Sequence, residues 1–174
     1  MKKISTDHIL SISALITAAV AVWIAVVEQQ SNREYQRLSV EPYLELSNTN
    51  IDGYKRLLTN TGLGPARIET VDVIIDGKEV ANWREAINIL IDKPKVKFTT
   101  SGLWHGRQIQ AGDKATLVHL KDLKPANELH QNISKMKMKI CYCSMYKDCW
   151  IKVNSSIPQA IEECPVDSHK YFPR

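Results

Sequence analysis

The longest apolar run of the sequence lies near its start, from Ile9 to Val27, and contains no charged residue. At about 1.5 Å per residue of helix, such a run is long enough to cross the roughly 30 Å hydrocarbon core of a membrane. A cleaved signal peptide is the alternative, but its apolar core is usually about 7–15 residues long and precedes a small-residue cleavage site. This run is longer and ends in two valines followed by Glu28. We therefore predict a retained transmembrane helix, preceded by a short N-terminal segment over residues 1–8.

The pattern changes twice after this run. Residues 28–41 are polar, contain neither Gly nor Pro and are rich in helix formers, so the helix is predicted to continue as a stem that ends before Pro42. From Pro42 onward the apolar positions follow a period of two, beginning with Leu44 and Leu46 between polar neighbours. This alternation is typical of half-buried strands. We therefore predict one β-rich domain over residues 42–174.

Short apolar or β-branched segments, separated by turn residues, recur through this domain. The predicted strands are 43–47, 54–61, 67–75, 78–80, 103–110, 115–120, 136–145 and 149–153. Asp76-Gly77 is a two-residue hairpin signal. A short helix is predicted after Asn82, which has Glu three positions later, and a brief helical turn is predicted at Pro125. An irregular tail is expected after the last strand. The spacing indicates a mainly β fold, an antiparallel immunoglobulin-like β-sandwich with one or two short helices.

Three motifs give the sequence a resemblance to a known group of proteins. They are V-E-P-Y-L-E-L at 40–46, T-N-T-G-L-G-P-A-R-I at 59–68 and I-C-Y-C-S-M-Y-K-D-C-W at 140–150. With the apolar segment, they make the chain resemble an uncharacterised group of single-span bacterial membrane proteins that have an N-x-G-x-G-P-A turn and a late C-Y-C…C-W hairpin. The resemblance implies a bacterial inner membrane and an immunoglobulin-like sandwich, and it implies no activity.

One stripe of the apolar segment consists of small residues at spacings of three and four. We call this stripe the helix seam; its members are Ser11, Ala14, Ala18, Ala21 and Ala25. Small residues let two helix backbones approach closely in lipid. The alternative is that alanine is common in membrane helices and the spacing is chance. We predict that the helix seam packs against an integral membrane protein partner or against a second copy of this chain.

The four cysteines are the sharpest chemical feature of the sequence. Cys141, Cys143 and Cys149 flank a predicted hairpin, and Cys164 lies in the tail. Four cysteines in so small a domain favour disulfides and an oxidising compartment. Three pairings are open from sequence, of which we favour Cys143–Cys149 across the hairpin and Cys141–Cys164 to the tail. Reduced, buried cysteines in a cytoplasmic domain are the alternative.

A soft-metal site is a further interpretation of the same segment. Cys141 and Cys143 are two residues apart on a predicted strand, so their thiols share one face, and Met145 follows on that face. Thiolate and thioether ligands select Cu(I), and there are single-span, immunoglobulin-like copper chaperones with a C-x-C strand. Here the cysteine strand comes late in the chain and its flanking residues differ from that pattern. No C-x-x-C pair with a correctly spaced partner pair indicates zinc, so no cofactor is predicted.

Charge argues against nucleic acid as a partner. The formal net charge is +4, and lysines alternate along the chain at positions 93, 95 and 97 and again at 135, 137 and 139. Such alternation suits the solvent-facing side of strands, where lysine also discourages edge-to-edge pairing. Nucleic-acid binders instead concentrate positive charge on one face.

The orientation in the membrane follows from charge and cysteines together. Lys2 and Lys3 precede the apolar run, whereas Arg33 and Arg37 follow it. This near balance favours a cytoplasmic N-terminus only slightly. The cysteine content adds to that preference, so we predict that the C-terminal domain lies in the periplasm.

The histidines provide no recognisable catalytic frame. They are His8, His105, His119, His130 and His169. None belongs to a G-x-S-x-G or H-E-x-x-H motif; His119 lies in an apolar strand, and His105 is expected in an exposed loop. A triad assembled in space is the alternative. We therefore predict a non-enzymatic accessory or assembly subunit of the membrane whose sandwich binds a protein partner, with a periplasmic Cu(I) chaperone and a membrane-bound hydrolase as alternatives.

Overall fold

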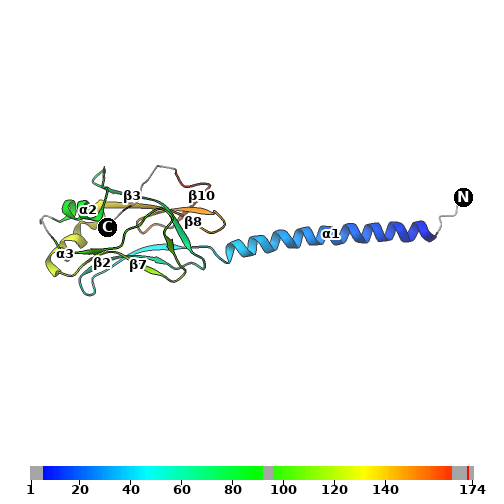
Figure 1. Cartoon of the computed structure of the whole chain (residues 1–174), viewed down its shortest axis with the longest axis horizontal. Coiled ribbons are helices and arrows are strands. Elements are labelled where there is room, and N and C mark those ends of the chain that lie inside the picture. The colour runs from blue at the N-terminus through cyan, green and yellow to red at the C-terminus, as the bar shows by residue number, and fades with distance from the viewer. Residues whose placement is uncertain (1–5, 92–95, 166–171, 173–174) are drawn as a thin grey trace. The chain divides into compact units, whose positions relative to one another are not determined.

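A computed structural model describes residues 6–91, 96–165 and 172 of the chain, with side chains from residue 10 onward. The chain divides into two compact units, Met1–Ser39 and Val40–Arg174. The first unit contains the helix α1 (Thr6–Leu38), and the second contains two β-sheets and two short helices (Figure 1).

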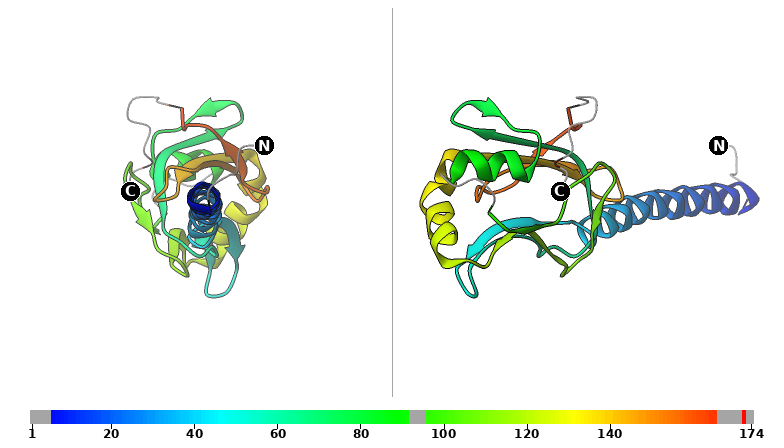
Figure 2. Two further views of the ribbon diagram at one scale, coloured as in Figure 1. Left: turned by 90° about the vertical axis from the view of Figure 1, so that its right-hand side faces the viewer. Right: turned by 60° about the vertical axis from the view of Figure 1, so that its left-hand side comes forward.

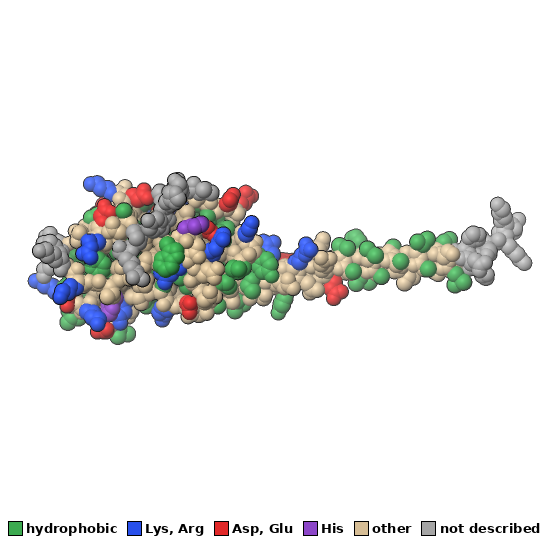
Figure 3. Space-filling model, viewed as in Figure 1, with side chains coloured by type: hydrophobic (Ala, Val, Ile, Leu, Met, Phe, Trp, Pro, Cys, Tyr) green, Lys and Arg blue, Asp and Glu red, His purple; other side chains and the backbone are tan. Residues whose placement is uncertain are grey.

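Helix α1 joins the predicted span and the predicted stem in one continuous helix. In the described part of the chain it is the one helix long and apolar enough to cross a membrane. A signal sequence near the N-terminus can have the same length and composition. Its described side chains are all exposed, including the large apolar side chains of Trp23 and Ile24. Among the side chains that Figure 3 draws in colour, apolar ones lie along most of the helix and charged ones nearer its C-terminal end. The helix ends at Leu38, before Pro42 as predicted.

The strands of the second unit form two antiparallel sheets. The four-stranded sheet has the order β1 (Leu44–Thr49), β2 (Tyr54–Asn60), β7 (Lys114–Leu120), β5 (Thr99–Thr100). The six-stranded sheet has the order β10 (Gln159–Ile161), β9 (Cys149–Val153), β8 (Met136–Cys143), β3 (Ala66–Ile75), β4 (Lys78–Glu79), and β6 (Gln108–Ile109) pairs with β3.

The way the chain passes between the sheets is that of an immunoglobulin-type sandwich. β1 and β2 share a sheet with the later strands β5 and β7, whereas β3 crosses to the other sheet and lies beside β8 and β9. The two sheets face each other, and α3 (Leu123–Asn132) lies at one end with α2 (Trp83–Leu90) next to it (Figure 2). A 3-10 turn, η1 (Ile133–Lys135), leads from α3 into β8. The predicted fold class is confirmed.

Alternation along the strands builds the core between the sheets. On β8, the inward-facing Met136, Met138, Ile140 and Tyr142 are each at most 1% exposed. Side chains of this kind, shielded from water on all sides, supply most of the favourable free energy of folding.

Two local motifs form as their sequences predict. Asp76 and Gly77 both have positive φ, at 47° and 80°, which is the geometry of the two-residue turn that joins β3 to β4. Asn82 caps α2, because its side-chain oxygen accepts a hydrogen bond from the Glu85 backbone at 2.9 Å. The Glu85 carboxylate in turn accepts a hydrogen bond from the backbone nitrogen of Ala81 at 2.8 Å. These short-range contacts fix the start of the helix.

The N-x-G-x-G-P-A turn is organised by a fully buried asparagine. Asn60 Oδ1 accepts hydrogen bonds from the backbones of Tyr43 and Gly62, and Nδ2 donates to the carbonyls of Gly64 and Ile109. All four hydrogen-bonding positions of the amide are therefore used. A Cβ atom on Gly62 would lie 2.3 Å from the Tyr43 nitrogen, so the glycine is required by close backbone packing.

The predicted strand pair 103–110 with 115–120 is wrong. Of the first segment only β6 is a strand, and it pairs with β3, whereas β7 pairs with β2 and β5. The physical reason is a turn at Gly106, whose φ is 80° and whose backbone nitrogen donates to the Ile68 carbonyl at 2.7 Å. This turn breaks the extended conformation that the β-branched and aromatic residues favour.

Three other segments also differ from the prediction. Pro125 belongs to the ten-residue helix α3 rather than to a brief turn. β8 ends at Cys143 instead of Met145, because the Ser144 backbone nitrogen donates to the Asp148 carbonyl at 2.7 Å and closes the hairpin. The tail is not wholly irregular, since β10 pairs with β9.

Candidate functional site

The four cysteines lie together on the outer face of the six-stranded sheet. Because side chains alternate along β8, Cys141 and Cys143 point away from the core while Ile140 and Tyr142 point into it. Cys149 is the direct cross-strand partner of Cys143. The cysteines form a small apolar cluster of their own, separate from the main core.

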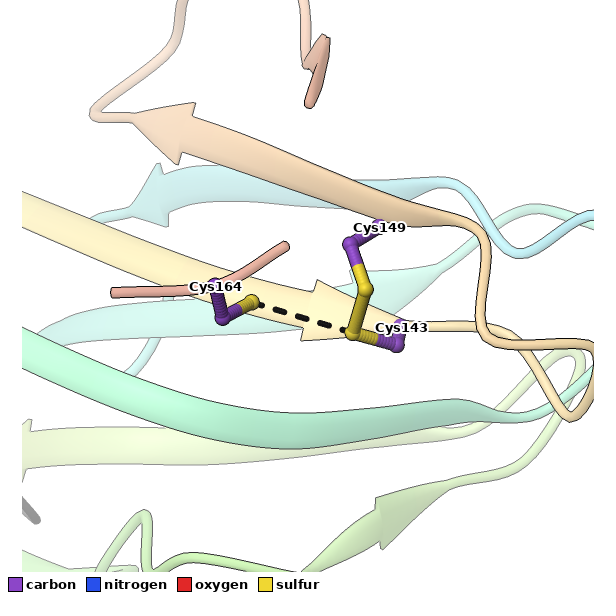
Figure 4. A group of neighbouring side chains, drawn as sticks. All are labelled: Cys143, Cys149 and Cys164. Carbon is purple, nitrogen blue, oxygen red and sulfur yellow. Dashed lines mark hydrogen bonds between the residues drawn. A yellow bond between two sulfur atoms is a disulfide. The ribbon is translucent and has the colours of Figure 1, made fainter. Parts of the chain in front are cut away.

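The structure joins the cysteines in the two pairs that the sequence favoured. Cys141 is bonded to Cys164, with their Cα atoms 5.9 Å apart, and Cys143 is bonded to Cys149, with their Cα atoms 4.0 Å apart. The two disulfides touch, because the sulfurs of Cys143 and Cys164 are 3.7 Å apart (Figure 4). All four side chains are buried.

The cysteine cluster holds the last part of the chain against the sheet. Ile151 of β9 and Ile161 of β10 pack against the cluster from the same face. β10 has three residues and lies at the sheet edge, so it is paired on one side by a short ladder. The Cys164 bond is therefore the covalent tie of this segment.

The sulfur atoms also define the best-placed candidate metal ligands. The ligand atoms of Cys143, Cys149 and Cys164 all lie within 4.8 Å of one another. This set differs from the predicted one, since Met145 is 61% exposed in the hairpin turn and Cys141 takes no part. In the disulfide state none of the three sulfurs is a thiolate, which is the form that binds Cu(I).

A polar group flanks the cysteines on β3. Arg67, the strand partner of Cys143, donates from Nε to Glu69 Oε1 at 2.6 Å. Glu69 lies in an irregularity of the β3–β8 pairing, and its other carboxylate oxygen is 3.3 Å from His105 Nδ1. The His105 side chain is 70% exposed, as predicted. In the described chain the His105 ring makes no hydrogen bond to a serine or threonine hydroxyl. His105 and Glu69 are therefore not placed beside a hydroxyl nucleophile.

The remaining histidines are dispersed. His119 Nε2 contacts the Asp52 carbonyl at 2.9 Å, which fits the structural role predicted for it. The His130 ring lies 6.0 Å from that of Tyr54. The backbone of His8 belongs to α1, but its side chain is not described. The other positions His169, Lys2, Lys3, Lys93 and Lys95 lie outside the described residues. Lys97, Lys135 and Lys137 are exposed and Lys139 is half-buried, in keeping with solvent-facing lysines.

The helix seam is continuous in α1. Its members, Ser11, Ala14, Ala18, Ala21 and Ala25, lie within one unbroken helix and are exposed. Their spacing places them on one side of the helix. The surface of α1 therefore combines an apolar circumference, which a membrane span requires, with one face of small side chains, which allows close helix packing.

The sandwich contains buried polar residues that were not predicted from the sequence. Burial raises the pKa of Tyr142 to about 12 and raises that of Tyr54, whereas burial lowers the pKa of Arg56. Arg56 and Lys152 are 5% and 3% exposed. The signal in the sequence is the alternation itself, which places Arg56 on the same side of β2 as Tyr54 and Leu58.

No protein-family model matches this chain, and no curated protein or solved structure shows significant similarity to it. The resemblance to single-span bacterial proteins is therefore supported only in its architecture, an N-terminal apolar helix followed by two antiparallel sheets with a C-terminal cysteine cluster, and no family is identified.

Proposed function

We propose that the protein is a single-span membrane protein of the bacterial inner membrane whose β-sandwich lies in the periplasm. In this proposal it is a non-enzymatic accessory or assembly subunit that binds a protein partner. The observation that carries the proposal is helix α1, an apolar helix whose described side chains are all exposed within the structure. Such a surface is stable only in lipid or against other apolar helices.

The cysteine cluster supports the periplasmic location. Disulfides persist in oxidising compartments, and the bacterial periplasm is one of them. Two buried, bonded pairs in the C-terminal part of the domain suit that environment. A C-terminal alkaline phosphatase fusion should therefore be active and a C-terminal green fluorescent fusion dark, and the reverse pattern would reject this orientation.

The helix seam supports a partner inside the membrane. Replacing Ala18 by leucine should leave insertion intact, because leucine is at least as favourable as alanine in lipid. It should weaken helix association by about 1–2 kcal/mol, roughly 5- to 30-fold, if the backbones touch at the seam. Val20→Leu on the opposite face is the matched control.

The test is purification of the full chain in mild detergent, with each variant in parallel. A partner that stays bound in the wild type and in Val20→Leu, but is lost in Ala18→Leu, supports the proposal. Equal behaviour of the two variants would mean that the seam is ordinary lipid-facing alanine, and the sandwich alone would then have to bind the partner.

A Cu(I) carrier is the second candidate, favoured by the close approach of the Cys143, Cys149 and Cys164 sulfurs. It requires the disulfides to be reduced, because thiolates are the ligands. Copper retained at one equivalent after purification under reducing conditions, and lost in Cys164→Ala, would support this candidate over the subunit proposal. Thiols blocked to alkylation in freshly isolated protein would oppose it.

A further inference from the structure

Arg56 places a positive charge inside the β-sandwich. It lies on the inward side of β2 between Tyr54 and Leu58, both fully buried, and is itself only 5% exposed. Arginine stays charged in proteins, and a buried charge is costly unless it is paired or fully hydrogen-bonded. The groups around the guanidinium therefore decide whether this position is stable by itself.

The hydrogen bonds made by Arg56 are few and long. Nη1 donates to Asn48 Oδ1 at 3.3 Å, and Nη2 donates to Asn154 Oδ1 at 3.4 Å. Both acceptors are shared, because Asn48 Oδ1 also accepts from the Tyr54 hydroxyl at 2.9 Å and Asn154 Oδ1 from the Met138 backbone at 2.8 Å. The buried Nε has no partner. Within the described residues no carboxylate lies within 4.0 Å of this guanidinium.

The other buried cation of the sandwich is better compensated. Lys152 Nζ donates to the Ser156 carbonyl and lies 6.0 Å from the centre of the Tyr43 ring. The negative charge of Glu45 also acts on Lys152, where it opposes the lowering of the pKa by burial. Among the described residues the group that acts on Arg56 in this way is the Tyr54 hydroxyl, which burial keeps protonated and therefore uncharged near neutral pH. The described residues therefore leave the charge of Arg56 without an opposite charge.

We propose that Arg56 is the base of an oxyanion-binding site beside Asn48, which belongs to the edge strand β1 of the four-stranded sheet. The planar guanidinium presents N–H groups in a fork that matches a carboxylate, phosphate or sulfate oxygen pair. Asn48 is exposed and Asn154 half-buried, so these two residues form the rim between Arg56 and solvent. The oxyanion comes either from a free small anion or from an acidic side chain of a partner protein.

The chain itself offers a sharp variant for this proposal. In Asn48→Asp, the side-chain oxygen that already accepts from Arg56 and Tyr54 becomes part of a carboxylate and supplies the missing charge internally. This variant should melt at a higher temperature than the wild type and should no longer respond to added oxyanions. Arg56→Gln should also lose the response. Lys55→Gln removes the same charge from the outer side of the same strand and should keep it.

The experiment is thermal unfolding of the full chain in mild detergent, at constant ionic strength, with chloride replaced stepwise by formate or sulfate. The expected result is a melting temperature that rises with formate or sulfate in the wild type and in Lys55→Gln, with a response at least tenfold weaker in Arg56→Gln. If Arg56→Gln does not fold, the comparison between the wild type and Asn48→Asp tests the proposal. An equal response in wild type and Asn48→Asp, or no response in the wild type, would overturn the proposal.

A second arm distinguishes the two sources of the oxyanion. The blocked peptide acetyl-Gly-Glu-Gly-amide carries one carboxylate in the setting of a protein chain. A shift at tenfold lower concentration with this peptide than with formate would assign the site to an acidic side chain of a partner. An equal or weaker effect of the peptide would assign it to a free anion.

Discussion

Removing each disulfide in turn should destabilise the domain by different amounts, because the two bonds close loops of different length. The pair Cys141–Cys164 spans 23 residues and Cys143–Cys149 spans 6. In the chain-entropy relation these loops correspond to about 3.4 and about 2.2 kcal/mol of stabilisation at 25 °C. The double variants Cys141→Ala with Cys164→Ala, and Cys143→Ala with Cys149→Ala, measure the two terms.

The two bonds are nested, which changes the larger figure only slightly. When Cys143 and Cys149 are already joined, the outer loop is effectively about 18 residues, which lowers its contribution by about 0.2 kcal/mol. The four side chains are similarly buried, so the packing lost on truncation to alanine is similar in the two variants. The difference of about 1 kcal/mol between them therefore reports loop length.

Urea unfolding of the full chain in mild detergent, followed by tryptophan fluorescence, is the assay. With a slope of about 2 kcal/mol per molar, the midpoint should fall by about 1.6 M without Cys141–Cys164, whose nested contribution is about 3.2 kcal/mol, and by about 1.1 M without Cys143–Cys149. If the first variant is no less stable than the second, the loop argument is refuted. Free thiols in freshly isolated wild type would refute the bonded state itself.

Two further predictions concern buried polar groups in the sandwich. Asn60→Ala should cost at least about 3 kcal/mol, because it leaves buried backbone groups of the turn without partners, whereas the exposed Asn50→Ala should change the urea midpoint little. Alkaline pH should destabilise the fold through Tyr142, since its pKa is about 12 in the folded state and about 10 when unfolded. The folded state then favours the protonated phenol, so stability is complete below pH 10 and is lost as pH rises toward 12, by at most about 1.4 kcal/mol per pH unit. Tyr142→Phe should flatten this pH dependence, and an unchanged slope in that variant would contradict the assignment.

The regular parts of the fold were predictable because local signals and tertiary packing agree there. The Asp76-Gly77 turn and the Asn82 cap each depend on residues within four positions of one another. The strand pair predicted for 103–110 failed because the turn at Gly106 is fixed by a contact to Ile68, which is distant in sequence. Propensity alone carries no information about such a contact.

The cysteine pairing and the Arg56 cluster show the same distinction at the level of sites. Cys143 and Cys149 flank one hairpin, so their proximity follows from the sequence. The neighbours of Arg56 come from other strands and turns, and Asn154 is 98 residues away along the chain. The sequence shows which way the arginine points but not which groups surround it, so the unbalanced charge is visible only in the folded chain.

The position of the cysteines argues that they secure the end of the chain rather than the core. β8 uses one face for the core, with Ile140 and Tyr142, and the other face for Cys141 and Cys143. A core of this size can form without covalent support, whereas the three-residue edge strand β10 pairs with β9 alone and has few other contacts to hold it. Reduction should therefore accelerate amide hydrogen exchange in β10 well before it affects β2 and β3. Equal acceleration in all three strands would mean that the disulfides stabilise the whole sandwich, and the cysteine cluster would then belong to the core in energetic terms.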